Sequence, residues 1–340
     1  MTRVGLIGAG KMGISHYAIL GAHPRVTVAA VCDSISYVTS ALRKHTGIET
    51  FKDFRRMIEA ASLDAVVVAT PTSSHHEAAT MALQRGLAVF VEKPLCLDPA
   101  QSTALSGLAR QKGKANQVGY HNRFIGTFQE TRRLVRAGAI GDVYHVAGTA
   151  FGQVVIRAKT GMTWRSSKSE GGGCLHDYAS HVVDLMNFVV GPPREVVAAE
   201  LRRIYSRDVE DAVYATFRYA DGSSGRLETN WSDPSHRKMS TTITVYGTKG
   251  KIVTDRQECR VFLREGADFE AYRPGWTIRY ITDLQKPVDF YLRGEEYSAQ
   301  LDAFIDAVEK GTAEHENSFA SAAETDTVID LVQKCAQGRA

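Results

Sequence analysis

The feature that most constrains the fold is a series of short, wholly apolar runs in the first 120 residues. These runs cover residues 4–8, 26–32, 65–69 and 88–91. Helical patterns separate them, at residues 12–21, 35–46, 53–61 and 76–85. Strands that are apolar on both faces are typical of a parallel sheet covered by helices on both sides. We therefore expect an α/β fold that begins with a doubly wound Rossmann domain over residues 1–120.

The pattern changes in the second part of the chain, where the expected strands are longer and several alternate apolar with polar residues. They cover residues 143–151, 196–204, 212–219, 225–231 and 242–246. Asp221-Gly222 lies between two of them and predicts a hairpin turn. Helices are expected at residues 128–137, 174–190, 298–310 and 319–337. These patterns predict a second, α+β domain over residues 121–340 with a largely antiparallel sheet.

That second sheet carries apolar residues on both faces. In the third of these expected strands, at residues 212–219, Val213, Ala215 and Phe217 alternate with Ala212, Tyr214 and Thr216. We expect one face to lie on helices and the other to bind another copy of the chain. The prediction is a homodimer or homotetramer that assembles through the C-terminal domain.

The composition gives no sign of a nucleic-acid-binding, membrane-spanning or secreted protein. The chain has 340 residues, 41 Lys plus Arg and 38 Asp plus Glu, so its formal charge of +3 gives no reason to expect a nucleic-acid or membrane partner. No apolar run reaches the roughly 20 residues needed to cross a bilayer, and the N-terminus has no signal-peptide pattern. Five scattered cysteines without a CxxC pair favour a reducing compartment, the cytoplasm.

A glycine motif follows the first apolar run and opens the first helical pattern. It contains Gly8, Gly10, Lys11, Met12 and Gly13. Two of the glycines allow a tight turn and close approach to a pyrophosphate, and the third allows helix–strand packing. Free N–H groups at the helix start would then meet the phosphates. The motif predicts a dinucleotide site.

Asp33 ends the second apolar run, twenty residues after Gly13. A carboxylate there accepts hydrogen bonds from the adenosine ribose hydroxyls and repels a 2′-phosphate. No Arg or Lys follows before Arg43. NAD is therefore the expected cofactor, with NADP as the alternative.

Two further segments carry residues suited to proton transfer. Glu92-Lys93-Pro94 directly follows an expected parallel strand, at the sheet edge where such sheets bind ligands. Asp177 and His181 follow a run of three glycines at i, i+4 spacing, so one helix face would present both. A carboxylate orients an imidazole and raises its basicity. A surface lysine and a surface helix pair are the alternatives, and we expect no metal site from His176, Asp177 and His181.

Together these motifs resemble the Gfo/Idh/MocA oxidoreductases, the glucose–fructose oxidoreductase and inositol dehydrogenase group. The resemblance runs essentially from end to end of the chain. It rests on residues 8–13 with His16, 69–71 with His75 and Glu77, 92–95, 119–120, 123–124, 164–165, 171–173 with Asp177 and His181, and 246–250. Ala179 departs from the pattern, because the family usually has glycine there.

The resemblance implies roles for individual residues. In such proteins the lysine and the Asp/His pair surround the carbon that exchanges hydride with the nicotinamide, and here these are Lys93, Asp177 and His181. It also implies cofactor contacts from Thr70, His75, Glu92 and Lys93. Substrate contacts are expected from Lys93, Tyr120, His121, Arg123, Trp164, Arg165, Asp177 and His181. Arg123 has an alternative as a buried salt-bridge partner.

The predicted function is an NAD(P)-dependent oxidoreductase acting on a secondary hydroxyl or keto carbon of a sugar, cyclitol or nucleotide sugar. Two alternatives stay open: a lyase or hydrolase that oxidises its sugar only transiently, and a cofactor-binding regulator without turnover. Residues 152–170 are rich in cations, and we expect Arg165 and the free N–H groups of Gly171–Gly173 to hold an anionic group on the substrate. A solvated loop is the alternative there.

Overall fold

The computed structural model describes residues 1–157, 164–313 and 315–338. The described chain forms two compact units. One contains residues 1–121 and 287–323, and the other contains residues 122–286 and 324–340. The boundary near residue 121 coincides with the expected one. Residues 287–323, which were expected in the second domain, instead belong to the first unit.

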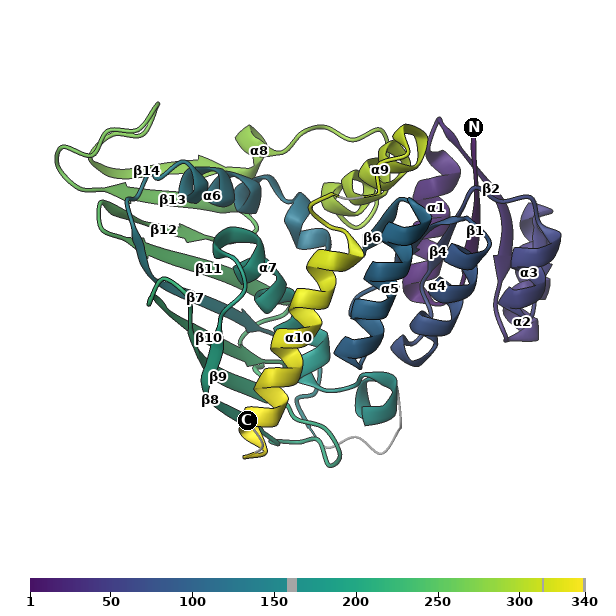
Figure 1. The fold of residues 1–340 in the computed structure, drawn as a ribbon, viewed down its shortest axis with the longest axis horizontal. Helices are drawn as coiled ribbons and strands as arrows, with labels where there is room; N and C mark the ends of the chain where they lie inside the picture. The colour runs from purple at the N-terminus through teal and green to yellow at the C-terminus, as the bar shows by residue number, and fades with distance from the viewer. Residues whose placement is uncertain (158–163, 314, 339–340) are drawn as a thin grey trace. The chain divides into compact units, whose positions relative to one another are not determined.

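The first unit is built on a six-stranded sheet in the order β3-β2-β1-β4-β5-β6, with every pairing parallel. This is the predicted doubly wound fold (Figure 1). Its strands are β1 (Thr2–Ile7), β2 (Val26–Cys32), β3 (Glu49–Phe51), β4 (Ala65–Val68), β5 (Ala88–Val91) and β6 (Asn116–Val118). Its helices are α1 (Lys11–Ala22), α2 (Ser36–Thr46), α3 (Phe54–Ala60), α4 (His75–Gln84), α5 (Pro99–Lys112) and α9 (Glu295–Lys310), with a short 3-10 helix η1 (Thr72–Ser74).

The strands β1, β2, β4 and β5 divide their side chains between two hydrophobic cores. In β4, Val66 and Val68 join a core with residues of α4 and α5, whereas Ala65 and Val67 join the core on the opposite face. Leu301, Phe304 and Ile305 of α9 complete that second core. Burial on both faces explains why these strands are apolar throughout. It also explains why α9 belongs to the first unit, although it lies far along the sequence.

The second unit contains an eight-stranded sheet in the order β14-β13-β12-β11-β7-β10-β9-β8. Only the β10–β7 pairing is parallel among its described ladders. Its strands are β7 (Val143–Phe151), β8 (Glu195–Arg202), β9 (Ala212–Arg218), β10 (Ser224–Asn230), β11 (Ser240–Gly247), β12 (Gly250–Thr254), β13 (Glu258–Leu263) and β14 (Gly275–Tyr280). The predicted α+β domain with a largely antiparallel sheet is confirmed.

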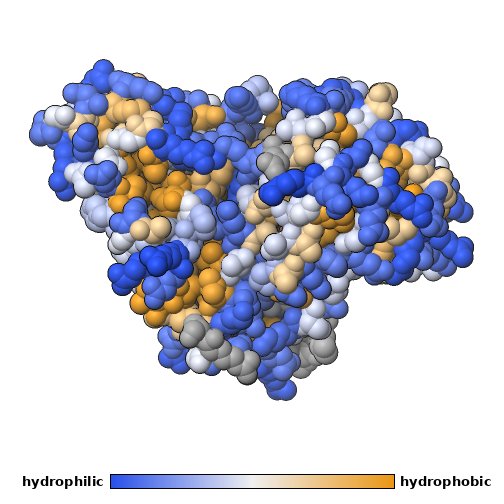
Figure 2. All heavy atoms as spheres, viewed as in Figure 1, coloured by the Kyte–Doolittle hydropathy of each residue, from blue (hydrophilic) through white to orange (hydrophobic). Residues whose placement is uncertain are grey.

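Helices cover one face of this sheet. They are α6 (Gly126–Arg136), α7 (Ser180–Val190), the short α8 (Ile281–Leu284) and α10 (Phe319–Ala336), which begins in the first unit. Short 3-10 helices lie at η2 (His121–Phe124), η3 (Trp164–Ser166) and η4 (Lys168–Glu170), and a π-helical turn, η5, covers Leu175–Ala179. Figure 2 shows hydrophobic side chains gathered where α6 and α7 lie on the sheet.

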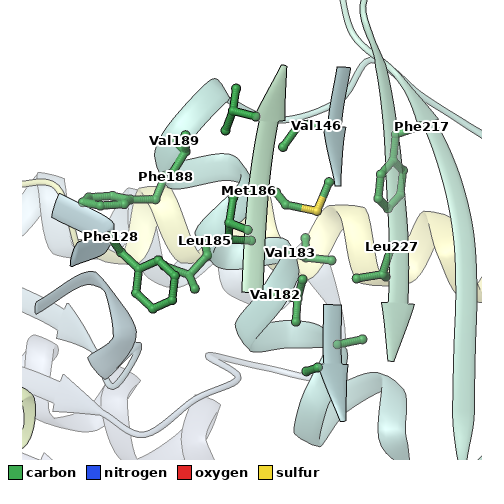
Figure 3. Packing of buried hydrophobic residues seen from close by; sticks show 14 of the residues in the cluster. Phe128, Val146, Val182, Val183, Leu185, Met186, Phe188, Val189, Phe217 and Leu227 are labelled. Carbon is green, nitrogen blue, oxygen red and sulfur yellow. The ribbon is translucent and has the colours of Figure 1, made fainter. Parts of the chain in front are cut away.

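Helix α7 packs closely on the centre of the sheet. Val182, Val183 and Met186 point toward Val146 of β7 and Leu227 of β10 (Figure 3). A Cβ at Gly148 of β7 would lie 2.4 Å from Val182, so glycine permits this close approach. The backbone of the turn that carries the predicted Asp/His pair is therefore held against a well-packed core.

The opposite face of the sheet carries polar and aromatic side chains. Val213, Ala215 and Phe217 of β9 are buried as expected on the helix side, whereas Tyr214 and Thr216 are exposed. Ala212 is buried, which the alternation did not predict. The hairpin turn at Asp221-Gly222 is confirmed, because β9 pairs antiparallel with β10 across it.

Candidate active site

The glycine loop after β1 has the shape that a dinucleotide requires. Gly8 has φ +92°, a conformation that favours glycine, and a Cβ at Gly13 would lie 1.9 Å from the Gly8 oxygen. A Cβ at Gly10, in contrast, would meet no atom within 4 Å. Gly10 is exposed and precedes α1, so Lys11 and Met12 present backbone N–H groups at the helix start. These residues fit the pyrophosphate of NAD.

Asp33 stands directly after β2, beside the glycine loop. Its Oδ2 accepts a hydrogen bond from the Ala9 N–H at 2.8 Å, and its Oδ1 accepts one from the Ile35 N–H at 2.8 Å. Each oxygen keeps a lone pair for a ribose hydroxyl. Arg43, the next cation along the chain, donates to the Thr50 carbonyl at 3.3 Å. This arrangement suits a ribose without a 2′-phosphate.

Replacing Asp33 with alanine should narrow the preference for NAD over NADP. The unmodified protein should bind NAD more tightly, because the carboxylate repels a 2′-phosphate. Titration of nicotinamide fluorescence measures both affinities. Equal or tighter binding of NADP by the unmodified protein would refute the assignment of Asp33.

Glu92 forms a hydrogen bond with His16 that the motif alone did not reveal. Its Oε1 lies 2.7 Å from Nε2 of His16, whose side chain is 0% exposed. Burial raises the pKa of Glu92, but the hydrogen bond with His16 and the charges of His16 and Lys93 outweigh it, so the net pKa is lowered. A Cβ at Gly119 would lie 2.9 Å from Glu92 Oε2. The carboxylate is therefore held firmly beside the half-buried Lys93.

His75 connects the ends of two neighbouring strands. Its Nδ1 lies 3.0 Å from the Pro94 oxygen, and its Nε2 lies 3.0 Å from the Thr70 oxygen. The ring is 1% exposed, and burial lowers its pKa. Thr70 Oγ1 also accepts a hydrogen bond from Ser74 Oγ at 2.7 Å. His75, which was predicted to contact the cofactor, therefore faces backbone carbonyls. It fixes the turn that carries Lys93.

The predicted substrate residues Tyr120 and His121 are buried in the first unit, 0% and 8% exposed. The His121 ring stacks on Tyr297 of α9, with ring centroids 4.5 Å apart. Burial raises the pKa of Tyr297 to about 12. The sequence did not predict the contact between His121 and Tyr297, because Tyr297 lies more than 170 positions after His121.

Asp177 and His181 lie in the second unit, 7% and 6% exposed. Asp177 is in the π-helical turn η5, and His181 is in the first turn of α7. The expectation of one regular helix over residues 174–190 was therefore wrong for its first turn. Turns of this kind occur frequently at functional sites. Ala179, the position where the family usually has glycine, is fully buried in the same turn.

Arg165 binds the Asp177 carboxylate. Its Nε donates to Asp177 Oδ2 at 2.9 Å, and its guanidinium lies 4.5 Å above the ring of Trp164. The side chain of Arg165 is 43% exposed, and that of Asp177 is 9% exposed. The structure thus brings three of the predicted substrate residues together, with the arginine paired to a protein carboxylate.

The N–H groups of the glycine run are already used within the chain. Gly171, Gly172 and Gly173 donate to the carbonyls of Lys168, Ser167 and Arg165, respectively, at 3.2, 2.9 and 3.1 Å. The expectation that these groups are free to bind an anion was wrong. Arg157 is exposed, and residues 158–163, which include Lys159, lie outside the described residues.

Arg123 forms a buried salt bridge, the alternative that the sequence left open. Its Nη2 and Nε donate to the two carboxylate oxygens of Asp184 at 2.6 and 2.8 Å. The two side chains are 5% and 1% exposed. Asp184 also accepts from Thr325 Oγ1 at 3.3 Å. The pair joins the start of the second unit to α7 and α10.

Replacing Arg123 with alanine should lower the free energy of unfolding by about 3–5 kcal/mol, because Asp184 would keep an unpaired charge in the core. Urea denaturation measures this loss. Arg202→Ala, which removes an exposed ion pair with Glu200, should cost less than about 1 kcal/mol. Equal losses for the two variants would contradict the structural role of Arg123.

Among the described residues, no three His, Cys, Asp or Glu side chains form a group that could hold a metal ion. In the same part of the chain, no helix is long and apolar enough to span a membrane.

The comparisons with known proteins agree with this geometry. Residues 2–120 match the family model described as "Oxidoreductase family, NAD-binding Rossmann fold", and residues 128–253 match the "GFO/IDH/MocA C-terminal domain". The chain is 30% identical to the rhizopine catabolism protein MocA of Rhizobium meliloti over 73% of this chain and 76% of that protein. It is 27% identical to levoglucosan dehydrogenase of Pseudarthrobacter phenanthrenivorans, over 81% and 80% of the two chains.

The fold is also similar to solved structures. A levoglucosan dehydrogenase in complex with NADH superposes with a TM-score of 0.89 at 24% identity, covering 100% of this chain and 98% of that one. The matched family models cover both units, and they include the glycine loop, Glu92-Lys93-Pro94 and the Asp177/His181 turn. The chain therefore belongs to the Gfo/Idh/MocA family and is an NAD-dependent oxidoreductase.

Proposed function

We propose that the protein transfers hydride between NAD and a secondary hydroxyl or keto carbon of a neutral sugar or cyclitol. The pairing of Arg165 with Asp177 at 2.9 Å is the observation that supports a neutral substrate. The cation that could have gripped a carboxylate or phosphate on the substrate is engaged by a protein carboxylate, and the N–H groups of the glycine run are engaged by carbonyls. A relative named levoglucosan dehydrogenase is consistent with a sugar substrate.

Lys93, Asp177 and His181 are the residues that we propose for the chemistry. NAD supplies the hydride acceptor when it is bound. Oxidation also requires removal of the hydroxyl proton, and an imidazole nitrogen of His181 accepts it, because histidine titrates near neutral pH. We assign the Lys93 ammonium the role of a hydrogen-bond donor in the same reaction. Asp177, which accepts a hydrogen bond from Arg165, stabilises the positive charge that His181 acquires.

The remaining predicted residues contribute contacts to substrate and cofactor. Tyr120 and His121 are buried aromatic residues of the first unit, whereas Trp164 is 41% exposed in the second. Glu92 and His75 act by fixing the segment around Lys93.

Screening purified protein against neutral sugars, inositols, uronates and sugar nucleotides, with NAD, tests this proposal. We expect NADH absorbance to rise with a neutral sugar or cyclitol, and one NADH to form per ketone. Turnover without net NADH would indicate a lyase or hydrolase that oxidises transiently. NAD binding without turnover on any substrate would indicate a regulator. A uronate or sugar nucleotide as best substrate, with kcat/KM lowered selectively by Arg165→Ala, would contradict the neutral class.

We also propose a homodimer or homotetramer that assembles through the open face of the eight-stranded sheet. Phe262 and Trp276 lie on that sheet with ring centroids 5.4 Å apart, and Lys251 Nζ lies 5.4 Å from the Trp276 ring. Trp276 is 54% exposed, and exposed aromatic clusters are typical of interfaces. Light scattering at micromolar concentration should give a multiple of the chain mass, and a monomeric mass would oppose the proposal.

The cytoplasm is the compartment we propose, because scattered thiols suit a reducing environment.

A further inference from the structure

Glu210 is a residue that no sequence motif singled out, yet it contacts the start of the turn that carries Asp177. We propose that Glu210 is a positioning residue that sets the geometry of Asp177 and His181 by holding residues 173–175. This inference rests on the proposed function, because it concerns the same proton-transfer residues. Glu210 acts through the backbone, and it is not itself a catalytic residue.

The contact between Glu210 and the turn uses both its main chain and its side chain. The Glu210 carbonyl accepts a hydrogen bond from the Cys174 N–H at 2.9 Å. Its Oε1 accepts one from the Leu175 N–H at 2.8 Å. A Cβ at Gly173 would lie only 2.2 Å from Oε1, and Gly173 has φ +107°. The carboxylate therefore lies directly against a glycine backbone and occupies the helix start, where an external anion would otherwise bind.

Glu210 is itself fixed by a rigid support. The next residue, Asp211, is 0% exposed and accepts hydrogen bonds from the N–H groups of residues 204–206 and from the Trp231 indole. The Trp231 N–H donates to the Asp211 carbonyl at 3.0 Å. Because Asp211 joins the loop to the beginning of β9, Glu210 has little freedom to follow the turn if the turn moves.

The hydrogen bonds of the turn carry this constraint to Asp177 and His181. The Asp177 N–H donates to the carbonyl of Gly173 at 3.1 Å. The Ser180 N–H donates to the carbonyl of Leu175, five residues back, which defines the π-helical turn. The two acceptors, Gly173 and Leu175, lie in the segment of residues 173–175 that Glu210 contacts. A shift of the segment would therefore move Asp177 and the residue next to His181 together.

The charge state of Glu210 is compatible with this role. Burial raises its pKa, while the Leu175 N–H and the charge of Lys168 oppose that rise. The Oε1 atom accepts a hydrogen bond from Leu175 whether the carboxyl group is ionised or protonated. The acceptor atom, rather than the charge, is thus the feature that the turn requires. An isosteric glutamine keeps that acceptor.

The experiment compares Glu210→Gln, Glu210→Ala and the control Asp208→Ala, with the neutral substrate on which the unmodified enzyme forms NADH. Asp208 is exposed on the same loop and carries the same charge. We expect Glu210→Ala to lower kcat by about 10²-fold, since misplacement of about 1 Å has effects of that size. Its NAD affinity should be unchanged, and the pKa that governs kcat/KM should shift. Glu210→Gln and Asp208→Ala should stay within about threefold of the unmodified enzyme, with its pH profile.

Three results would overturn the proposal. One is a Glu210→Ala enzyme with unchanged kcat and pH profile. Another is a Glu210→Gln enzyme that is as impaired as Glu210→Ala, which would exclude the acceptor atom as the cause. The third is loss of NAD binding together with kcat in Glu210→Ala, which would show general misfolding. Absence of NADH formation by the unmodified enzyme on every substrate would instead count against the proposed function, so the two failures are distinguishable.

Discussion

Replacing His181 with alanine is expected to lower kcat by about 10²- to 10⁴-fold, the usual contribution of a positioned acid–base group. His181 is 6% exposed and follows the π-helical turn that holds Asp177, so its imidazole is held in one place. The affinity for NAD should change little, because the glycine loop and Asp33, the residues that we propose for cofactor binding, belong to the other unit. Steady-state kinetics and cofactor titration measure the two effects separately.

His45→Ala is the matched control for this prediction. His45 is exposed near the end of α2, so its removal should leave kcat unchanged. A small external base such as imidazole should restore part of the His181→Ala activity, and the restored rate should rise with pH as the base loses its proton. A His181→Ala enzyme with more than a tenth of the original kcat would show that another group accepts the proton.

Replacing Gly10 with valine is expected to weaken NAD binding by about 10²-fold or more while the protein stays as stable as before. A Cβ at this position meets no atom within 4 Å, and the backbone angles of φ −70° and ψ −169° are open to any residue. The added side chain would therefore occupy the space that the pyrophosphate needs. Calorimetric titration with NAD and a thermal melt give the two quantities.

Gly21→Val, at the other end of α1, is the control. A Cβ at Gly21 also meets no atom within 4 Å, and the residue is exposed. Its substitution should leave NAD affinity unchanged. If Gly10→Val bound NAD as tightly as the unmodified protein, the phosphates would not approach Gly10 and the glycine loop would not be the cofactor site.

Much of the first unit could be predicted from its sequence, because its strands carry a local signal. Ala65–Val68 and Ala88–Val91 are apolar throughout since both of their faces are covered, and no amphipathic pattern competes with that reading. The place of α9 could not be predicted. Leu301, Phe304 and Ile305 show that the helix is amphipathic, but not that the buried face packs on β1 rather than on its neighbours in sequence.

In the second unit, β12, β13 and β14 were not predicted. Their strands are short, and β14 has Trp276, Ile278 and Tyr280 exposed, so the usual alternation of buried apolar and exposed polar residues fails there. The π-helical turn was also missed, because residues 174–179 contain nothing that disfavours an ordinary α-helix. The turn also bonds to a distant part of the chain, since the Leu175 N–H donates to Glu210, 35 positions away.

The candidate functional residues also divide into local features that could be predicted and long-range contacts that could not. The local geometry of Gly8, Gly13 and Asp33 could be predicted, because it follows from backbone structure at fixed spacing. The partners of the charged residues could not. Arg123 bonds with Asp184, Arg165 with Asp177, and Glu92 with His16 across 61, 12 and 76 positions, respectively. Only the tertiary fold decides whether such an arginine faces a substrate or a carboxylate.

Hydride transfer from a substrate carbon to NAD can be followed with the best neutral sugar or cyclitol of the screen, carrying deuterium on the reacting carbon. We expect the deuterium to appear on the nicotinamide ring of the reduced cofactor, detected by mass spectrometry, and kcat for the deuterated substrate to be no higher than for the ordinary one. Recovery of the deuterium in solvent water, with unlabelled reduced cofactor or none, would contradict hydride transfer.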